Sequence, residues 1–362
     1  MCRSMRASTS PIASEAAEMN DQATPVSPSR PRRWERSAVE EIPVLDLGRY
    51  MAGDDGEIER LAAELGHAQQ HIGFFYITNH GIAQELVDRV FAETARFHAL
   101  PTEERLKLLI DDQQTGYAPM KSSQIEDGDV AVEKSPHKPD LSEAIWIRRD
   151  RPDDDPELVA GRPFRRNKWP QGLPGFRETI RAYQQAMEAL GRRMLPLYAR
   201  ALDLPDVYFD PLFDRADIPV RLGHYPADLV GDANQFGAAP HNDAGFLTLL
   251  PQPEEDGLEV LTQSKKWIPA PVRRGDILVN GGNCLVRFSN GRFLSTPHRV
   301  LAGRPRPRYS IPLFYNPNFD AVVQPVPSCV SADRPAMYEP TTYEQYIIDY
   351  LARVYAHRRK PG

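Results

Sequence analysis

The chain has 362 residues, 41% of them hydrophobic, and a formal net charge of −6 at pH 7. This length is sufficient for a sizeable core in one large or two moderate domains. The sequence lacks an apolar stretch of about 18 residues and a basic tract, which argues against a membrane span and against a nucleic-acid partner. Three widely spaced cysteines (Cys2, Cys284 and Cys329) do not form a disulfide framework. We therefore expect a cytoplasmic protein, and nothing in the sequence implies a protein partner.

The first 39 residues differ in composition from the rest of the chain. They are rich in Ser, Pro, Ala and charged residues and show no apolar periodicity, so we predict a disordered N-terminal extension. The segment lacks the apolar core of a secretory signal. Met19 offers an alternative start, which leaves open whether residues 1–18 are part of the native chain.

Periodicity predicts the elements that follow. Apolar residues recur at three- and four-residue steps over 57–72, 84–97 and 176–202, which indicates amphipathic helices. Residues 111–172 are polar, rich in Pro and Asp and weakly periodic, and we interpret the acidic run 149–156 within them as a solvated loop instead of a metal site. From 220 to 315 the pattern changes to short β-rich segments broken by Gly, Pro and Asn, as in a small β-sandwich. A last amphipathic helix is predicted over 342–358.

The His241-Asn242-Asp243 run contains the first candidate metal ligands. Residues two apart in a strand point to the same face, so His241 and Asp243 can share a metal ion while Asn242 faces away. His298 is the candidate third ligand. The apolar segments 285–288 and 292–294, separated by Asn290-Gly291, are expected to form a β-hairpin that returns the chain toward the first strand.

Two imidazoles and a carboxylate leave coordination positions open, which is typical of non-haem Fe(II) that activates dioxygen. Hydrolytic zinc uses the same ligand types and is the main alternative. Arg308 and Ser310 lie on one face of a later predicted strand. A guanidinium beside a hydroxyl is suited to holding a carboxylate, and a hydrolytic zinc site has no general need of such a clamp. The combination therefore favours iron.

Several further motifs carry a resemblance to a known family. They follow one another in the order Ile42-Pro43-Val44-Leu45-Asp46-Leu47, Gly73-Phe74-Phe75-Tyr76-Ile77-Thr78-Asn79-His80-Gly81-Ile82, Asn167-Lys168-Trp169-Pro170, His224-Tyr225-Pro226 and Ser289-Asn290-Gly291-Arg292-Phe293. Together with the candidate site, this order resembles the isopenicillin N synthase-like family of Fe(II)- and 2-oxoglutarate-dependent dioxygenases. The resemblance spans residues 40 to 350.

The resemblance implies an α+β fold whose double-stranded β-helix, or jelly roll, is flanked by helices. It places an N-terminal dioxygenase region with helices and a lid loop at 40–172, a long helix and the catalytic core at 173–340, and a C-terminal helix at 341–362.

Carried over by position, the resemblance makes His241, Asp243 and His298 the Fe(II) ligands. It makes Arg308 and Ser310, assisted by Tyr225, the clamp for the distal carboxylate of 2-oxoglutarate, with O2 as the second cosubstrate. One position departs from the pattern: many relatives have Asn two places before this Tyr, where the chain has Gly223. The resemblance therefore predicts an altered cosubstrate pocket.

The resemblance also implies the reaction class: oxidation of a C–H bond in a small molecule of the secondary-metabolite type. The outcome is hydroxylation, desaturation or cyclisation, with release of succinate and CO2. Positions matching Arg221, Phe314, Asn316 and Tyr117 face the substrate or close over it in relatives, although each also fits a structural role. Two alternatives remain: an iron-dependent oxidase that does not use 2-oxoglutarate, and an inactive jelly-roll binding module.

Overall fold

The structure is a computed structural model that describes residues 34, 36–37, 39–54, 56–111, 114–122, 138–152, 154–155, 166–232 and 234–354. The predicted N-terminal extension therefore lies almost wholly outside the described residues, as do residues 355–358 of the predicted C-terminal helix. None of the helices within the described ranges is long and apolar enough to cross a bilayer.

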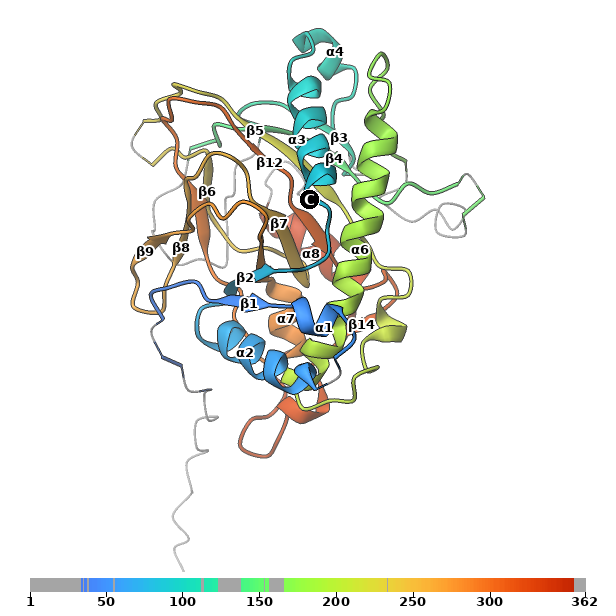
Figure 1. Cartoon of the computed structure of the whole chain (residues 1–362), viewed down its shortest axis with the longest axis vertical. Helices are drawn as coiled ribbons and strands as arrows, with labels where there is room; N and C mark the ends of the chain where they lie inside the picture. Colours follow the sequence, from blue (N-terminus) through green and yellow to red (C-terminus); the bar gives the residue numbers. More distant parts are fainter. Residues whose placement is uncertain are drawn as a thin grey trace, which may run out of the picture.

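Two β-sheets form the centre of the molecule, a long one and a short one (Figure 1). In spatial order the long sheet contains β1 (Val44–Asp46), β2 (Phe74–Thr78), β10 (Ile277–Gly281), β7 (Leu247–Pro251), β13 (Leu313–Tyr315), β5 (Val220–Tyr225), β4 (Glu143–Ile147) and β3 (Gly116–Ala118), with β12 (Arg308–Ser310) also paired to β5. The short sheet contains β6 (Ala238–His241), β11 (His298–Val300), β8 (Leu258–Leu261) and β9 (Trp267–Pro269).

The long sheet is covered on both faces. One apolar cluster joins residues of β2, β5, β7 and β10 to residues of β6, β8 and β11, so it lies between the two sheets. A larger cluster joins the other face of the long sheet to the helices. The double cover explains why β7 and β10 are buried at every position instead of alternating. This arrangement is the predicted jelly roll flanked by helices.

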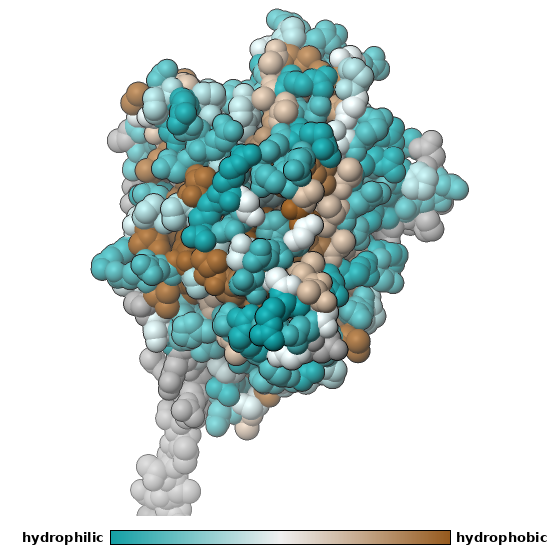
Figure 2. All heavy atoms as spheres, in the orientation of Figure 1, coloured by the Kyte–Doolittle hydropathy of each residue, from teal (hydrophilic) through white to brown (hydrophobic). Residues whose placement is uncertain are grey.

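The helices lie mainly on the outer face of the long sheet, and α6 runs along it with α2 and α3 packed at its two ends (Figure 1). Figure 2 shows that hydrophilic side chains dominate the visible face of the molecule. The helices are α1 (Gly48–Met51), α2 (Glu57–His71), α3 (Gln84–His98), α4 (Thr102–Leu106), α6 (Phe176–Ala201), α7 (Asn283–Phe288) and α8 (Tyr343–Val354). Smaller elements are the 3-10 turns η1 (Asp210–Leu212) and η2 (Pro327–Cys329) and the ribbon of β14 (Val322–Val323) with β15 (Thr341–Thr342).

Helix α6 shows how closely these layers approach. Its buried side chains, among them Ile180, Met187 and Met194, recur at helical spacing and face the sheet. Where the helix crosses β13, the residue is Gly191. A Cβ there would lie 2.8 Å from the ring of Tyr315, so the close approach of helix and strand requires glycine.

The three long helices begin at the predicted residues and end within one residue of the prediction. The weak periodicity of 111–172 did not indicate strands, but β3 and β4 form there and extend the long sheet. Strand β4 has Glu143 among apolar residues and is buried on both faces, so it has neither strict alternation nor a uniformly apolar run.

The predicted β-hairpin at 285–294 was also wrong. Its first arm lies in helix α7, which begins after the extended residue Gly282. Asn290 and Gly291 do adopt positive φ, 48° and 74°, but this left-handed turn ends a helix instead of joining two strands. A short apolar run bounded by Gly fits both a strand and a buried helical turn, so periodicity could not decide between them.

Candidate metal centre and carboxylate clamp

The predicted metal ligands converge at one end of the short sheet. His241 ends β6 and His298 begins β11, and the two residues are direct partners in the antiparallel register. Asp243 was expected on the same strand as His241, but β6 ends before it. Asp243 instead belongs to the loop that leads into β7, and this loop turns its carboxylate back toward both imidazoles.

The two imidazoles present the same nitrogen to the carboxylate. Nε2 of His241 and of His298 lie 4.0 and 3.8 Å from Oδ1 of Asp243. On the far side of each ring, Nδ1 donates to a backbone carbonyl, that of Ala239 at 2.7 Å and that of Thr296 at 3.1 Å. A histidine held through Nδ1 in this way has its Nε2 lone pair available for a metal ion.

The second oxygen of Asp243 is held by two neighbours. Oδ2 accepts hydrogen bonds from the Thr248 hydroxyl at 2.5 Å and from the Asn280 amide at 2.7 Å. Burial raises the pKa of Asp243, but the two histidines and these two donors outweigh it, so the pKa lies below its ordinary value. Burial, followed by the nearby His298, lowers the pKa of His241 to about 4. The cluster is thus two imidazoles, His241 neutral at pH 7, and an ionised carboxylate, a donor set suited to a divalent metal ion.

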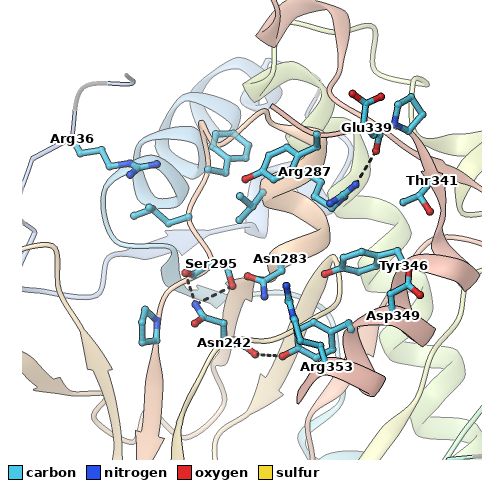
Figure 3. Close-up of a pocket in the computed structure, with 17 residues that line it drawn as sticks. Arg36, Asn242, Asn283, Arg287, Ser295, Glu339, Thr341, Tyr346, Asp349 and Arg353 are labelled. Carbon is cyan, nitrogen blue, oxygen red and sulfur yellow. Dashed lines mark hydrogen bonds between the residues drawn. The ribbon is translucent and has the colours of Figure 1, made fainter. Parts of the chain in front are cut away.

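The loop that carries Asp243 is braced from outside by helix α8. The hydroxyls of Tyr350 and Tyr346 donate to the backbone carbonyls of Asn242 and Ala244, at 3.2 and 2.8 Å. The Asn242 amide faces away from the metal cluster, as predicted, and donates to the carbonyl of Ser295 at 2.6 Å. Asn242, Ser295, Tyr346 and Tyr350 line one wall of a cleft of about 670 Å³ (Figure 3).

The predicted carboxylate clamp assembles on two paired strands. Arg308 and Ser310 on β12 are in register with Tyr225 and Gly223 on β5. Arg308 is 2% exposed, and its Nε and Nη1 atoms are buried without a partner among the described residues. Burial lowers the pKa of Arg308 to about 10, with Tyr225 opposing the shift and Arg304 and Arg221 adding to it, so the group remains protonated at neutral pH. A buried cation with unused donors fits the carboxylate that the sequence predicts there.

Phe314, a predicted substrate contact, lies on the inner face of the long sheet. It is in register with Thr248, whose hydroxyl bonds to Asp243, so its side chain shares the face of the metal cluster. Its ring stacks on Trp146, with centroids 5.6 Å apart and planes 20° apart. Trp146 is in register with Arg221. The sequence did not single out Trp146, because its contribution depends on the pairing of β4 with β5.

Arg221 also lies on the inner face, but its guanidinium extends toward the clamp. Nη1 donates to the hydroxyl of Tyr225 and Nη2 to the hydroxyl of Ser142, both at 3.3 Å. Ser142 was likewise not singled out by the sequence. It is buried and directly precedes β4.

Tyr117 was expected in a loop that closes over the substrate and Asn316 was expected to face it, but both side chains lie elsewhere. Tyr117 is in register with Ile145 on the outer face of the sheet, where it is buried and donates its hydroxyl to Glu143. Asn316 is buried, and its Oδ1 accepts the backbone N–H of Phe246 at 3.0 Å. Both residues have the structural role that was the alternative: Tyr117 supports the helix-covered face, and Asn316 holds the turn after the metal loop.

A second group of possible metal ligands lies on the outer face, where His98 and His224 flank Glu143. The Glu143 carboxylate accepts hydrogen bonds from Arg105 at 2.5 Å, from the Tyr117 hydroxyl and from His224 at 2.8 Å. These partners use the hydrogen-bond acceptors of the carboxylate, and the Arg105 guanidinium balances its charge. We therefore interpret the group as a buried polar network beneath the clamp strands.

Comparison with known proteins agrees with this geometry. The N-terminal family model of non-haem dioxygenases in morphine synthesis matches residues 42–172, and that of the 2OG-Fe(II) oxygenase superfamily matches residues 219–317. The 2-oxoglutarate-Fe(II) type oxidoreductase hxnY of Emericella nidulans is 33% identical over 84% of this chain and 88% of its own length. Kihadalactone A synthase LFS of Citrus sinensis is 32% identical over 87% of this chain and 94% of its own length.

Solved structures show the same likeness. A full-length Neurospora crassa protein in complex with alpha-KG and thymine superposes with a TM-score of 0.75 and 29% identity, covering 86% of this chain and 96% of that one. JOX2 in complex with 2OG, Fe and JA gives a TM-score of 0.70 and 25% identity, covering 93% and 91%. The chain therefore belongs to the Fe(II)- and 2-oxoglutarate-dependent dioxygenases, a family of oxidoreductases that use iron, 2-oxoglutarate and dioxygen.

Proposed function

We propose that the chain hydroxylates a C–H bond of a small molecule with a flat apolar part, of the kind found among secondary metabolites, and releases succinate and CO2. The observation that supports this proposal most directly is the Trp146–Phe314 stack on the sheet face that carries the metal cluster. Both side chains are only half-buried, which is unusual for large aromatic residues stacked inside a sandwich. Such a pair offers a flat apolar wall to a planar ligand.

The metal cluster and the clamp supply the rest of the reaction. We propose that His241, Asp243 and His298 hold iron, which activates dioxygen once 2-oxoglutarate is bound. Arg308, Ser310 and Tyr225 hold the distal carboxylate and so fix the orientation of the cosubstrate. None of these side chains is required to act as an acid or base on the substrate. Their work is to bind, to orient and to leave one side of the metal accessible.

The relatives support a small-molecule substrate. The solved Neurospora crassa structure contains thymine, and the name of the Citrus sinensis relative is that of a synthase of a single compound. The compounds in these two names differ from one another, so the relatives support a small molecule as the class of substrate and do not name the compound.

An anaerobic titration tests the proposal. The Fe(II)-loaded enzyme with 2-oxoglutarate is titrated with aromatic or heteroaromatic compounds and with their saturated counterparts, and the visible absorption band of the metal complex is followed. We expect the planar member of a matched pair to perturb the band at lower concentration, and Trp146→Ala to remove this preference while 2-oxoglutarate binding is retained. If planar and saturated compounds perturbed the absorption band equally, the proposed preference for a planar substrate would be wrong.

Turnover then separates the remaining alternatives. With an identified substrate, we expect one succinate per hydroxylated product. Oxidation of the substrate without succinate would identify an oxidase that does not use 2-oxoglutarate. Ligand binding that persists without iron, with no oxidation under any condition, would identify an inactive binding module.

A further inference from the structure

Gly223 lies among the residues of the carboxylate clamp. On the inner face it is in register with Ser310 on one side and Ala144 on the other, so a row of small residues crosses three strands. Arg308 and Tyr225 lie beside this row toward one end of the strands, and Arg221 lies beside it toward the other. The centre of the clamp therefore carries only small side chains, and an arginine lies on each side of them.

The guanidinium of Arg221 occupies the space that a side chain at position 223 would take. A Cβ built on Gly223 would lie 2.3 Å from Nη1 of Arg221, whereas the nearest backbone atom, the Ser310 carbonyl oxygen, would be at an ordinary 3.6 Å. Glycine at this position, where the sequence resemblance predicts Asn, thus lets Arg221 fold back along its own strand and reach Tyr225.

Two cations consequently meet at one phenol. The Cζ atoms of Arg308 and Arg221 lie 5.2 and 5.7 Å from the centre of the Tyr225 ring. Burial, then Arg304 and then Arg221 lower the pKa of Arg308, so the positive charges of Arg221 and Arg308 repel each other across the clamp. Within the described ranges, neither guanidinium forms an ion pair with a carboxylate of the chain. A ligand carboxylate would relieve this repulsion.

The direction of the Arg221 hydrogen bond matters for Tyr225. Because Nη1 of Arg221 donates to the phenol oxygen, the Tyr225 O–H remains available as a donor. The same contact polarises the hydroxyl and fixes its position. The Ser142 hydroxyl accepts a hydrogen bond from the second Arg221 nitrogen, Nη2. Ser310 lies beside Gly223 on the neighbouring strand, so hydroxyls and guanidinium groups surround this glycine.

We propose that Arg221 is a positioning residue of the cosubstrate clamp: it orients Tyr225 and adds a second positive charge beside the distal carboxylate of 2-oxoglutarate, and Gly223 is the residue that admits it. This assignment moves Arg221 from the substrate side, where the sequence resemblance placed it, to the cosubstrate side. It concerns 2-oxoglutarate binding and is independent of the proposed planar substrate.

The test measures binding and does not depend on turnover. The Fe(II)-loaded enzyme is titrated anaerobically with 2-oxoglutarate, with calorimetry and the metal absorption band as readouts, for wild type, Arg221→Met, Arg221→Lys and Gly223→Ala. We expect Arg221→Met to raise the Kd for 2-oxoglutarate about tenfold or more, and Arg221→Lys to recover part of the loss. Arg273→Met, which removes an exposed arginine outside the clamp, is the control and should leave the Kd unchanged.

Gly223→Ala provides the second arm. The atom it displaces is the end of a flexible side chain, so the fold should accept the new methyl group while Arg221 is expelled. We expect a loss of 2-oxoglutarate affinity similar to that of Arg221→Met. The variant that combines Gly223→Ala with Arg221→Met should lose no more affinity than either single variant, because both changes remove the same Arg221–Tyr225 contact.

A short 2-oxo acid distinguishes positioning from general damage. 2-Oxobutanoate has the chelating end of 2-oxoglutarate but no distal carboxylate, so its affinity should be the same in wild type and in Arg221→Met. Equal weakening of both acids would indicate a structural defect and overturn the proposal. Unchanged 2-oxoglutarate affinity in Arg221→Met would overturn the proposal too. If this variant then bound only the substrate more weakly, Arg221 would be assigned to the substrate site instead.

Discussion

The Thr248 hydroxyl donates to Oδ2 of Asp243 at 2.5 Å, so the two oxygens of this carboxylate have different roles. Asn280 donates to the same oxygen, while Oδ1 faces Nε2 of both histidines. The carboxylate is therefore fixed in rotation and presents one oxygen to a metal ion. Thr248 and Asn280 lie on β7 and β10, so the long sheet orients a ligand whose two partners belong to the short sheet.

Thr248→Val tests this orienting contact. Valine keeps the shape of threonine but cannot donate, so the Asp243 carboxylate would rotate more freely and bind metal less well. We expect metal affinity or activity to fall about 10- to 100-fold. Competition with a coloured Fe(II) chelator measures the affinity directly. Thr248→Ser retains the hydroxyl and should remain near wild type, and wild-type affinity in the valine variant would contradict the role of the hydroxyl.

Asp243→Ala removes the only anionic member of the cluster and leaves the two histidines. We expect succinate formation to be abolished, because two imidazoles alone would bind iron weakly and in a less defined geometry. Metal content after dialysis and succinate release measure the two effects. Asp217→Ala is unsuitable as a control, because Asp217 forms a buried ion pair with Arg148. Asp206→Ala, which removes an exposed carboxylate, serves better. Normal turnover by Asp243→Ala would contradict the assignment of this ligand.

Arg308→Ala should separate cosubstrate binding from metal binding. The buried guanidinium has two unused donors and no role among the metal ligands, so its loss should act on 2-oxoglutarate. We expect the 2-oxoglutarate concentration needed for half-maximal turnover to rise about 100-fold, with Fe(II) affinity changed by less than about threefold. Arg308→Lys keeps the charge but loses the planar guanidinium, so its requirement for 2-oxoglutarate should lie between those of wild type and Arg308→Ala. Parallel losses of both affinities would indicate that the strand itself is disturbed.

The sequence predicted the parts of the fold that depend on local pattern. Helix α6 was predicted from its own periodicity, and its first residue, Phe176, is the one expected. The sequence also predicted His241, Asp243, His298 and Arg308 as site residues, because the chemistry of a side chain does not depend on the local backbone. Asp243 illustrates this point, since it reaches the expected place from a loop instead of a strand.

The parts that could not be predicted depend on strand pairing. Tyr117 was expected at the substrate, but its register with Ile145 turns it to the opposite face, and a shift of one residue is enough to exchange the faces of a strand. Trp146 joins Phe314 only because β4 and β13 flank the same strand, which no local pattern reveals. The contact between Gly223 and Arg221 likewise depends on a side-chain conformation and not on the sequence spacing alone.

Glu143→Gln should reveal the buried network beneath the clamp through the pH dependence of stability. Burial alone would raise the pKa of Glu143, but hydrogen bonds from His224 and Tyr117 and the nearby His98 imidazole outweigh it, and the pKa lies well below its ordinary value. A carboxylate whose folded pKa is depressed stabilises the fold above its unfolded pKa of about 4.3 and loses this contribution as the pH falls toward the folded pKa. The ionised form also pairs with Arg105.

We therefore expect the variant to lose about 2–3 kcal/mol of unfolding free energy at pH 7, since glutamine keeps the shape but leaves Arg105 without its anion. The difference from wild type should narrow between pH 5 and pH 3, because only the wild type loses stability on protonation of this group. Urea unfolding of the metal-free proteins over this pH range measures the change. Glu259→Gln, which affects a more exposed pair with Arg299, should lose less than about 1 kcal/mol. A large difference that does not vary with pH would show that the network contributes through shape and packing instead of through the charge of Glu143.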